Sequence, residues 1–591
     1  MKRPALDDEF ANQVVDARST TASRRPRGRL LIGLLICCAV PRVWIAVRLD
    51  TLCNDALFYI ELAEGLERGD LEAGLGRLRL NTYPPVLALL HSVGLDWELA
   101  GKCWGVAMAS LTVLPLFGWL RLQFNEQLAV VGCLLYAFHP KLIEWSPELI
   151  RDPTFWLLWT LGLYSSWRAA SETRLSWYLL SGLVIALAIH TRFEGWFLYL
   201  PLMGWSVCRQ VAVRMEDGLP GRLTRAGRPG RPSSNAARGS ALRAAAGCAA
   251  AVAVCPLLLL AVNLTWLAGQ PRWELGNFNR LEYVALWTQA VWQAVRGDGH
   301  DGARATAVDS SPSAAAVSTA PAALAAPVQT LPAPVMMPQR MGASRALWIF
   351  VNTLRRGFGV LFGLCWLAGF ACRPRLWLRR DHMVLFLVAG CVAAGTWVHL
   401  WYAQATSSRY FLAIVVLAAP CAAMGCCWAC RGLERAASWL FAWTSFVPQR
   451  IALARSVAVL VLLVIAAGAA EIVATRYDGR RREAALGRWV LGEFGPGQRI
   501  LTPGPVGLIG YYARAARDAM DTESGTPTDK ADLAIALRHS VAPAELAAFI
   551  ASARRQGMRP IDAQRLPRGY DWRDVVVLTR SWKKSICKSV N

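Results

Sequence analysis

Long runs of apolar residues dominate the chain, and most of them are long enough to form helices that cross a membrane. A spanning helix needs about 20 predominantly apolar residues. The first run follows a cluster of Arg and lacks a small-residue cleavage site, so we expect a retained anchor and not a signal peptide. By length and apolar content the sequence predicts about eleven spans, over residues 29–47, 99–120, 126–143, 153–168, 176–190, 195–208, 244–268, 357–371, 383–401, 411–429 and 455–474. The predicted fold class is an α-helical polytopic membrane protein.

Composition supports the same class. Hydrophobic residues make up 54% of the 591 residues and charged residues 18%, whereas soluble proteins carry about 25% charged residues. A net charge of +23 on a soluble protein would suggest a nucleic-acid partner, but in a membrane protein it indicates Arg-rich loops on one side. We therefore expect no nucleic acid. Cys427 and Cys430 have a CxxC spacing without a second pair or a nearby His, so we expect no metal site there.

The charge of each loop gives the chain an orientation, because cytoplasmic loops carry an excess of Lys and Arg. With residues 1–28 in the cytoplasm, loop 209–243 is cytoplasmic and carries eight Arg against two acids. Loop 372–382 carries four Arg against one Asp, whereas the first outer loop, 48–98, carries nine acids against four Arg. We expect an integral protein of the plasma (inner) membrane, with a membrane domain over 29–476. An odd number of spans places residues 477–591 outside the cytoplasm.

Two stretches do not resemble membrane segments. Residues 300–345 are rich in Ala, Pro, Ser and Thr without an amphipathic period, which predicts a disordered insert in an outer loop. Residues 477–591 combine helical spacing over 481–494 and 542–556 with strand-like runs, which predicts a small soluble α/β domain. The strand-like runs are 499–501 and 574–579. Three glycines of this segment, at 504, 507 and 510, do not match G-x-G-x-x-G, so we expect no nucleotide site.

Polar residues at the ends of the predicted spans gather on the outer side. An ionisable side chain at membrane depth is expensive to bury, so one at a span edge is a functional candidate by default. We therefore expect a site at the outer membrane surface, built from several loops. The candidates are Asp50 and Asp55 after the first span, His139, Glu144, Glu148, Arg151 and Asp152 between the third and fourth, Arg192 and Glu194 between the fifth and sixth, and Arg409 and Tyr410 before the tenth.

Each of these residues also has a structural interpretation. A carboxylate just past a helix end commonly caps the helix or is solvated. Arg192 and Glu194 equally suit an ion pair that closes a tight hairpin, and the acids between 61 and 72 have the spacing of the exposed face of an interfacial helix. His91 and His139 lack a second spaced partner, so we expect neither to bind a metal.

Five short motifs follow one another through the predicted outer loops. They are Asp55-x3-Tyr59-x3-Ala63-x2-Leu66-x2-Gly69, then Tyr83-Pro84-Pro85, the segment SPELIRDPTF with Asp152, Thr191-Arg192-Phe193-Glu194-Gly195, and Ser408-Arg409-Tyr410. In this order they resemble GT-C glycosyltransferases of the protein O-mannosyltransferase and aminoarabinose-transferase kind, polytopic enzymes that use polyprenyl-phosphate-linked sugars. The resemblance is closest over 29–210. In such families an acid follows the first Asp and the Pro-Pro turn leads into the second span. Here Ala56 follows Asp55, so a metal contact by that second acid is in doubt.

The resemblance implies an inverting transfer of a sugar from a polyprenyl-phosphate donor to an extracytoplasmic acceptor, with protein, lipid and envelope glycan as the alternatives. Asp55 would act as the general base. Arg192 and Arg409, with Arg151 behind them, would stabilise the leaving phosphate, and Asp152 would position a donor hydroxyl, a metal ion or one of these Arg. The remaining substrate-binding candidates are Tyr59, Tyr83, Glu194 and Tyr410.

Two other classes of function are compatible with a polytopic chain. A flippase for lipid-linked saccharides, or a secondary transporter, often has inverted repeats and charges near the bilayer midplane, whereas here the charges lie at one face. A scaffold that binds partners through residues 477–591 leaves the one-sided cluster unexplained. The sugar, the acceptor and the need for a divalent metal stay open.

Overall fold

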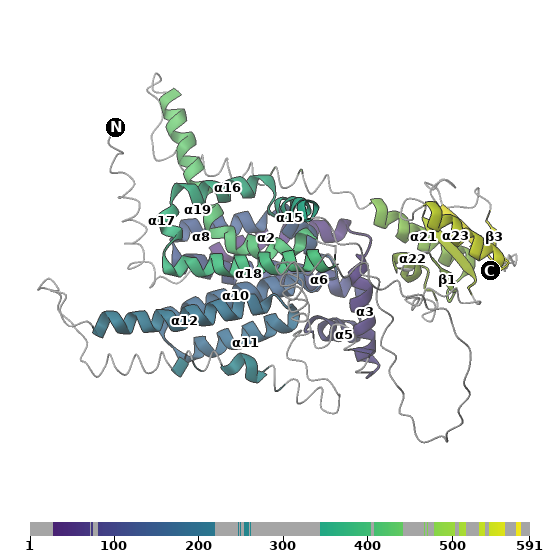
Figure 1. Cartoon of the computed structure of the whole chain (residues 1–591), viewed down its shortest axis with the longest axis horizontal. Helices are drawn as coiled ribbons and strands as arrows, with labels where there is room; N and C mark the ends of the chain where they lie inside the picture. The colour runs from purple at the N-terminus through teal and green to yellow at the C-terminus, as the bar shows by residue number, and fades with distance from the viewer. Residues whose placement is uncertain are drawn as a thin grey trace, which may run out of the picture. The chain divides into compact units, whose positions relative to one another are not determined.

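A computed structural model shows a mainly helical chain with a small sheet near its C-terminus (Figure 1). It describes residues 28–70, 73–74, 81–218, scattered positions between 246 and 261, 343–403, 407–440, 466, 470, 478–502, 507–515, 531–537, 543–561 and 575–580. The chain divides into two compact units, and each is described by itself. The first unit comprises residues 1–164 and 426–591, and the second comprises residues 165–425.

The helices of the first unit begin with one long apolar helix and continue with shorter ones that are capped as their sequences predict. Asp96 accepts a hydrogen bond from the amide of Leu99, and Asn125 accepts one from Leu128, so each satisfies an otherwise unpaired amide of the first turn. The elements are α2 (Gly28–Arg48), α3 (Asn54–Glu67), α5 (Tyr83–Ser92), α6 (Trp97–Leu111), α7 (Val113–Gln123), α8 (Glu126–Ala137), α9 (Pro140–Trp145) and the start of α10 (Asp152–Glu172).

The second unit continues with long helices and one sharp bend. Between α15 and α16 the chain turns by 93° at Gly359, whose φ of 68° is a conformation that L side chains rarely adopt. α16 also crosses α19 very closely, since a Cβ at Gly369 would collide with the carbonyl of Cys421. The elements are α11 (Leu175–Thr191), α12 (Gly195–Gly218), α15 (Ala343–Phe358), α16 (Val360–Cys372), α17 (Pro374–Trp377), α18 (Arg380–Ala403), the 3₁₀ turn η1 (Ser408–Phe411) and α19 (Leu412–Leu440).

The C-terminal elements form a four-stranded sheet of order β1-β2-β4-β3 with helices packed against it. β1 pairs with β2 in parallel, and the other two pairs are antiparallel. The predicted helices 481–494 and 542–556 and strands 499–501 and 574–579 match observed elements within a few residues. The elements are α21 (Asp478–Phe494), β1 (Ile500–Leu501), α22 (Gly507–Tyr512), β2 (Leu533–Leu537), α23 (Pro543–Arg555), β3 (Arg559–Pro560) and β4 (Val575–Thr579). That residues 477–591 act as a separate extracytoplasmic domain stays a prediction.

Four helices in the described part of the chain are long and apolar enough to cross a membrane, and the bent pair α15–α16 is a fifth candidate. The four cover Gly28–Arg48, Trp97–Gln123, His382–Leu400 and Ser408–Gly432. Nine of the eleven predicted spans lie on described helices, but the total of eleven stays a prediction. Span 455–474, most of span 244–268, and nearly all of the insert 300–345 lie outside the described residues.

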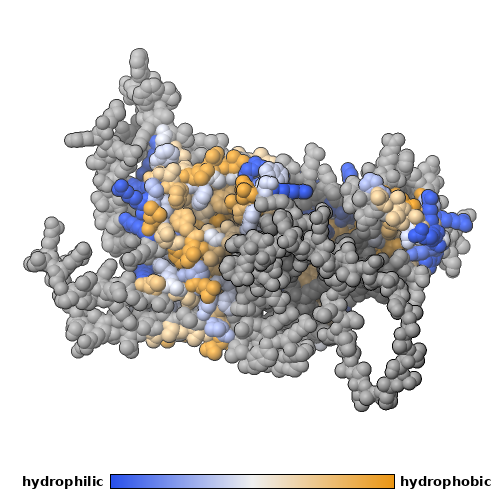
Figure 2. Space-filling model, viewed as in Figure 1, coloured by the Kyte–Doolittle hydropathy of each residue, from blue (hydrophilic) through white to orange (hydrophobic). Residues whose placement is uncertain are grey.

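Exposed apolar side chains cover these helices, as expected of surfaces that face lipid. On the face drawn in Figure 2, hydrophobic side chains spread over the helical part of the chain. α2 exposes Ile36 and Val47, at 54% and 81% of their surface. Such exposure would be costly in water, so it favours a membrane environment for these helices.

Two boundaries differ from the predictions. The helix that begins at Gly195 continues to Gly218, so the first part of the predicted loop 209–243 is helical and the rest lies outside the described residues. Tyr83-Pro84-Pro85 does not lead into the second span but forms the first turn of a separate helix, α5. The physical reason is that proline is well accommodated in the first turn of a helix, where its missing amide would be unpaired anyway. The second span begins only at Trp97.

Candidate active site

The strongest candidate for a catalytic base, Asp55, lies in the first turn of α3. The residue before this helix, Cys53, adopts an extended backbone and is buried. A carboxylate in a first turn is favoured by the helix dipole. Asp55 itself is partly exposed, so its side chain is fixed to an ordered helix and remains accessible. This combination suits a group that must exchange a proton with a substrate.

Tyr59 and Tyr83 pack against each other behind Asp55. Their rings meet edge to face with centroids 5.1 Å apart, and Figure 1 shows the two helices that carry them, α3 and α5, side by side. Burial raises the pKa of the Tyr83 hydroxyl well above its usual value, and Tyr59, Cys53 and Asp152 add to the rise. The electrostatic influence of Asp152 indicates that the start of α10 lies near these tyrosines. Tyr83 therefore stays protonated.

The turn 146–151 carries Arg151 and leads into Asp152, and it is tightly packed. Arg151 and Asp152 are 7% and 2% exposed. A Cβ at Gly105 would collide with the carbonyl oxygen of Ser146, and one at Gly101 would collide with the side chain of Leu149. Two glycines at i and i+4 on α6 therefore let the turn lie directly on this helix. Such packing fixes the backbone from which Arg151 and Asp152 extend.

In the second unit, Arg192 and Glu194 form an ion pair between α11 and α12. The Nη2 and Nε atoms of Arg192 lie 2.5 and 3.1 Å from the two carboxylate oxygens of Glu194. The side chains are 5% and 13% exposed, and a bidentate pair of this kind holds a guanidinium in one orientation. The structural interpretation of these residues, an ion pair in a tight turn, is confirmed. It does not exclude a further role for Arg192.

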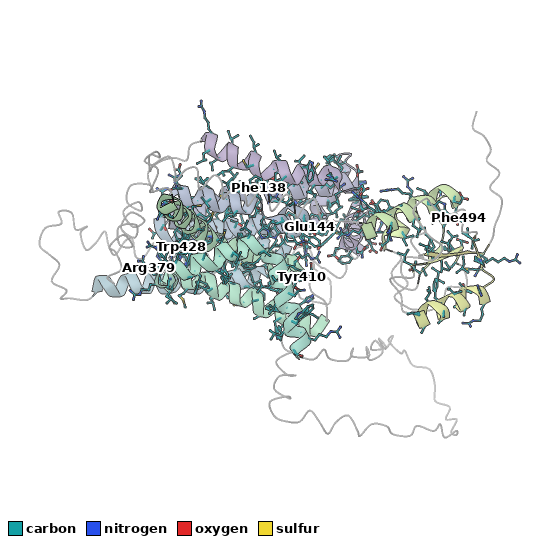
Figure 3. The ribbon with its side chains drawn as sticks, turned by 90° about the horizontal axis from the view of Figure 1, so that it is seen from above. Phe138, Glu144, Arg379, Tyr410, Trp428 and Phe494 are labelled. Atoms are coloured by element: carbon teal, nitrogen blue, oxygen red, sulfur yellow. The ribbon has the colours of Figure 1, made fainter. Side chains whose placement is uncertain are left out.

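The ring of Tyr410 brings Arg192 and Arg409 together. Their guanidinium carbons lie 5.3 and 5.4 Å from its centroid, within the range of a cation–π interaction. Tyr410 lies in η1, just ahead of α19 (Figure 3). Guanidinium groups held in fixed orientations are of a kind that suits an anion such as phosphate. The sequence motifs at 191–195 and 408–410 thus converge in space.

The predicted site residues fall into two groups, one in each unit. Asp55, Tyr59, Tyr83, Arg151 and Asp152 belong to the first unit, whereas Arg192, Glu194, Arg409 and Tyr410 belong to the second. In the first unit Tyr59 contacts Tyr83, and in the second unit the ion pair and the ring of Tyr410 connect all four residues. A joint role for the two groups stays a prediction.

Two buried charged residues lie near the turn 146–151: Arg42, which was not singled out from the sequence, and Glu148, whose partner the sequence could not predict. Arg42, fully buried within α2, donates hydrogen bonds to the hydroxyl of Ser146 and to the carbonyl oxygen of Ala137. Its position inside a predicted span was a usable signal. Glu148, 2% exposed, forms an ion pair with Arg480 of α21, and no sequence pattern links two residues so far apart. Among the described residues no three His, Cys, Asp or Glu side chains are grouped as metal ligands would be.

The architecture is that of a GT-C membrane protein, as a comparison with solved structures shows. ArnT from Cupriavidus metallidurans bound to undecaprenyl phosphate superposes with a TM-score of 0.53 at 12% identity, covering 93% of this chain and 98% of that one. The apo state of the same protein gives a TM-score of 0.49 at 11% identity, with the same coverage of both chains. The Archaeoglobus fulgidus oligosaccharyltransferase gives 0.41 at 12% identity, covering 79% of this chain and 58% of that one.

Sequence comparison adds one family. Residues 84–217 match the family model described as dolichyl-phosphate-mannose-protein mannosyltransferase. No curated protein matches the chain in sequence. The matched segment contains the turn 146–151, Arg151, Asp152 and the ion pair of Arg192 with Glu194. The predicted resemblance to GT-C proteins is thereby confirmed.

Proposed function

We propose that this chain is an integral membrane glycosyltransferase that moves a sugar from a polyprenyl-phosphate donor to an acceptor outside the cytoplasm. The observation that carries the proposal is the convergence of Arg192 and Arg409 on the ring of Tyr410, in a chain with the fold of a protein solved with undecaprenyl phosphate. A paired guanidinium site suits the phosphate of such a donor. The donor's isoprenoid tail would lie in the bilayer.

The proposed reaction is a single displacement with inversion. The acceptor oxygen forms a bond to the anomeric carbon while the bond from that carbon to the phosphate oxygen breaks. Asp55 takes the acceptor's proton as the new bond forms. The electron pair leaves with the phosphate, and Arg192 and Arg409, with Arg151 behind them, stabilise the negative charge that develops there.

The remaining candidates orient the substrates and the catalytic groups. Glu194 holds the Arg192 guanidinium through its bidentate ion pair. Asp152 would position a donor hydroxyl or an Arg from the base of the site. Tyr59 would line the site, whereas Tyr83, fully buried, would support Tyr59 from behind. Ala56, also fully buried, stands where the related families have a second acid, so the residues present do not suit a metal held by that pair.

The contacts of the first unit support the proposed orientation in the membrane. Arg481 and Arg488 of α21 hydrogen-bond to Asp50, which directly follows the first span. The C-terminal elements and the first outer loop must then lie on the same side of the membrane. This requires an even number of crossings between them, as the predicted topology of eleven spans gives. We place this side outside the cytoplasm because of the excess of Arg in loops 209–243 and 372–382.

The proposal is tested with the purified full-length protein in detergent. Polyprenyl-phosphate donors that carry different radiolabelled sugars are incubated with envelope extracts that contain candidate acceptors. Transfer of label from a donor lipid to an acceptor supports the proposal, because no membrane is present across which a lipid could be moved. Label that stays on the donor in detergent, but crosses the bilayer of proteoliposomes, would overturn it in favour of a flippase or transporter.

A further inference from the structure

A buried ion pair joins the C-terminal elements to the turn 146–151. Nη1 of Arg480, near the start of α21, lies 2.5 Å from Oε1 of Glu148. Glu148 is 2% exposed and the Arg480 side chain 30%. A buried carboxylate is very costly unless a cation accompanies it. Within the described residues Oε2 of Glu148 has no hydrogen-bond partner, so Arg480 provides the main compensation for its charge.

A second set of contacts holds the chain just ahead of Asp55. Arg481 donates to the carboxylate of Asp50 and to the carbonyl oxygen of Arg48, and Arg488 donates to the carbonyl oxygen of Asp50. The hydroxyl of Tyr512, in α22, accepts a hydrogen bond from the amide of Leu52 at 3.2 Å. The exposed pair of Arg481 with Asp50 is individually weak. Together, however, the hydrogen bonds to main-chain atoms fix the conformation of residues 48–52.

The C-terminal elements contact the region around α3 through apolar as well as polar side chains. Leu508 of α22 is 1% exposed and belongs to the same buried cluster as Cys53, Ala56, Tyr59 and Tyr83. Tyr511 and Tyr512 pack against this cluster. The C-terminal elements therefore contribute to the core that surrounds the first turn of α3, so this contact is more than a surface salt bridge.

We propose that α21 and α22 complete the candidate active site, with Arg480 as a positioning residue that acts through Glu148 on the turn carrying Arg151 and Asp152. The inference rests on the proposed function. As a positioning residue, Arg480 acts on the turn through Glu148, while Arg481, Arg488 and Tyr512 hold residues 48–52 ahead of Asp55. Residues more than 300 positions further along the chain therefore contact the segments next to the catalytic candidates of the first unit.

The electrostatics of Glu148 give the proposal a measurable signature. Burial raises the pKa of Glu148 and Glu144 adds to the rise, whereas Arg480 and a hydrogen bond from Cys53 oppose it. Arg480 is the strongest influence that lowers the pKa of Glu148. Without it the effect of burial dominates more strongly, so the pKa of Glu148 rises further. In the wild type, the Glu148 carboxylate becomes protonated as pH falls through its pKa and can no longer hold Arg480, so kcat should fall over this range. In an Arg480→Gln variant no ion pair remains to be lost, so this part of the acid limb should be absent and kcat should be low on both sides of it.

The experiment compares Arg480→Gln, Arg480→Lys and Arg482→Gln in the full chain. Arg482 is the matched control, since it is exposed on the same helix and forms no ion pair among the described residues. In Arg480→Gln we expect kcat to fall by about tenfold to a hundredfold with little change in KM for the donor. The part of the acid limb that reflects protonation of Glu148 should be absent in this variant. Arg480→Lys should recover part of the rate, and Arg482→Gln should behave as wild type.

A second measurement reports on the contact without using activity. The buried thiol of Cys53 adjoins both Glu148 and Arg480. The rate at which it reacts with a water-soluble maleimide, followed by mass spectrometry, therefore measures how often the contact between Arg480 and the turn 146–151 opens. Arg480→Gln should speed this reaction and Arg482→Gln should not. Unchanged kcat, pH profile and labelling in Arg480→Gln, with Asp55→Asn inactive, would overturn the positioning role alone. If the wild-type protein transfers no sugar, the proposed function fails. The labelling rate of Cys53 then still decides whether Arg480 holds the turn 146–151.

Discussion

Arg192 and Glu194 form a bidentate ion pair although only Phe193 separates them in the chain. The pair orients the guanidinium toward the ring of Tyr410, beside which Arg409 also lies. Glu194 therefore holds the Arg192 guanidinium beside the ring of Tyr410, and we expect this orientation to suit the phosphate of a donor.

Replacing Glu194 with Gln should weaken donor binding. The neutral amide holds the Arg192 guanidinium less firmly in one orientation, and binding must then fix that side chain, so we expect a loss of affinity of about tenfold. Binding of a polyprenyl phosphate to the purified protein checks this prediction. Glu172→Gln, at the C-terminal end of α10, removes a carboxylate that pairs with Arg168 and serves as the control. Equal affinities for both variants would contradict the role given to Glu194.

Changing Asp55 to Asn should abolish transfer and leave the fold intact. The substitution removes the proposed general base at nearly constant volume, and loss of such a group lowers rates by about 10²–10⁴-fold. Turnover of the purified variant with a defined donor measures the effect. Glu61→Gln, an exposed acid on the same helix, is the matched control. Wild-type turnover in Asp55→Asn would show that the base is elsewhere.

Arg409→Gln should weaken donor binding more than it changes the stability of the protein. The guanidinium beside Tyr410 would no longer offer paired hydrogen bonds to a phosphate, so we expect a loss of affinity of about tenfold or more. Titration with polyprenyl phosphate, alongside Arg375→Gln in the predicted cytoplasmic loop, tests this expectation. Donor affinity that is the same in both variants would remove Arg409 from the phosphate site.

Gly105→Ala should destabilise the protein through the turn 146–151. The added methyl group would collide with the main chain of Ser146, and overpacking of this kind costs about 1–3 kcal/mol. Thermal unfolding in detergent should show a lower midpoint, and transfer activity should fall because Asp152 is displaced. Gly33→Ala is the control, since its Cβ meets nothing within 4 Å. Similar midpoints for the two variants would mean that the turn accommodates the methyl group.

Arg42→Met should also lower stability, although the new side chain is compatible with a membrane helix. It leaves the carbonyl oxygens of Cys38 and Ala137 without the donor that they share, at a cost of about 2–4 kcal/mol. The unfolding midpoint in detergent measures the change, with Arg29→Met, exposed at the start of the same helix, as the control. A midpoint equal to that of the control would show that water replaces the guanidinium.

Sequence patterns located the helices because the apolar runs that define them are local. A run such as 29–47 must be helical in a bilayer, since its main-chain groups can pair only with one another. For the same reason the motifs at 191–195 and 408–410 were recognisable individually, and the predicted topology placed both at the outer surface. Their contact at the ring of Tyr410 is known only from the structure. Arg42 was detectable too, as the ionisable residue inside a span.

Other features depend on packing between distant segments and have no local signature. The pairing of Arg480 with Glu148 joins residues 332 positions apart, and no period or motif connects them. The contact of Gly101 and Gly105 with the turn 146–151 is equally invisible, since neither glycine stands out within an apolar run. The separate helix α5 was missed because Pro84 and Pro85 suit a turn and the first turn of a helix alike.

The right-angled junction at Gly359 leaves α16 as a short helix, which limits the thickness of bilayer that α16 can cross. α16 has 13 residues and is therefore about 20 Å long, whereas the hydrocarbon layer of a membrane is about 30 Å thick. A bilayer crossed by α16 alone would have to thin beside α15, which packs on η1 through Phe350 and Phe411. We expect lipid headgroups at this place to lie nearer the bilayer midplane than they do beside the full-length helices.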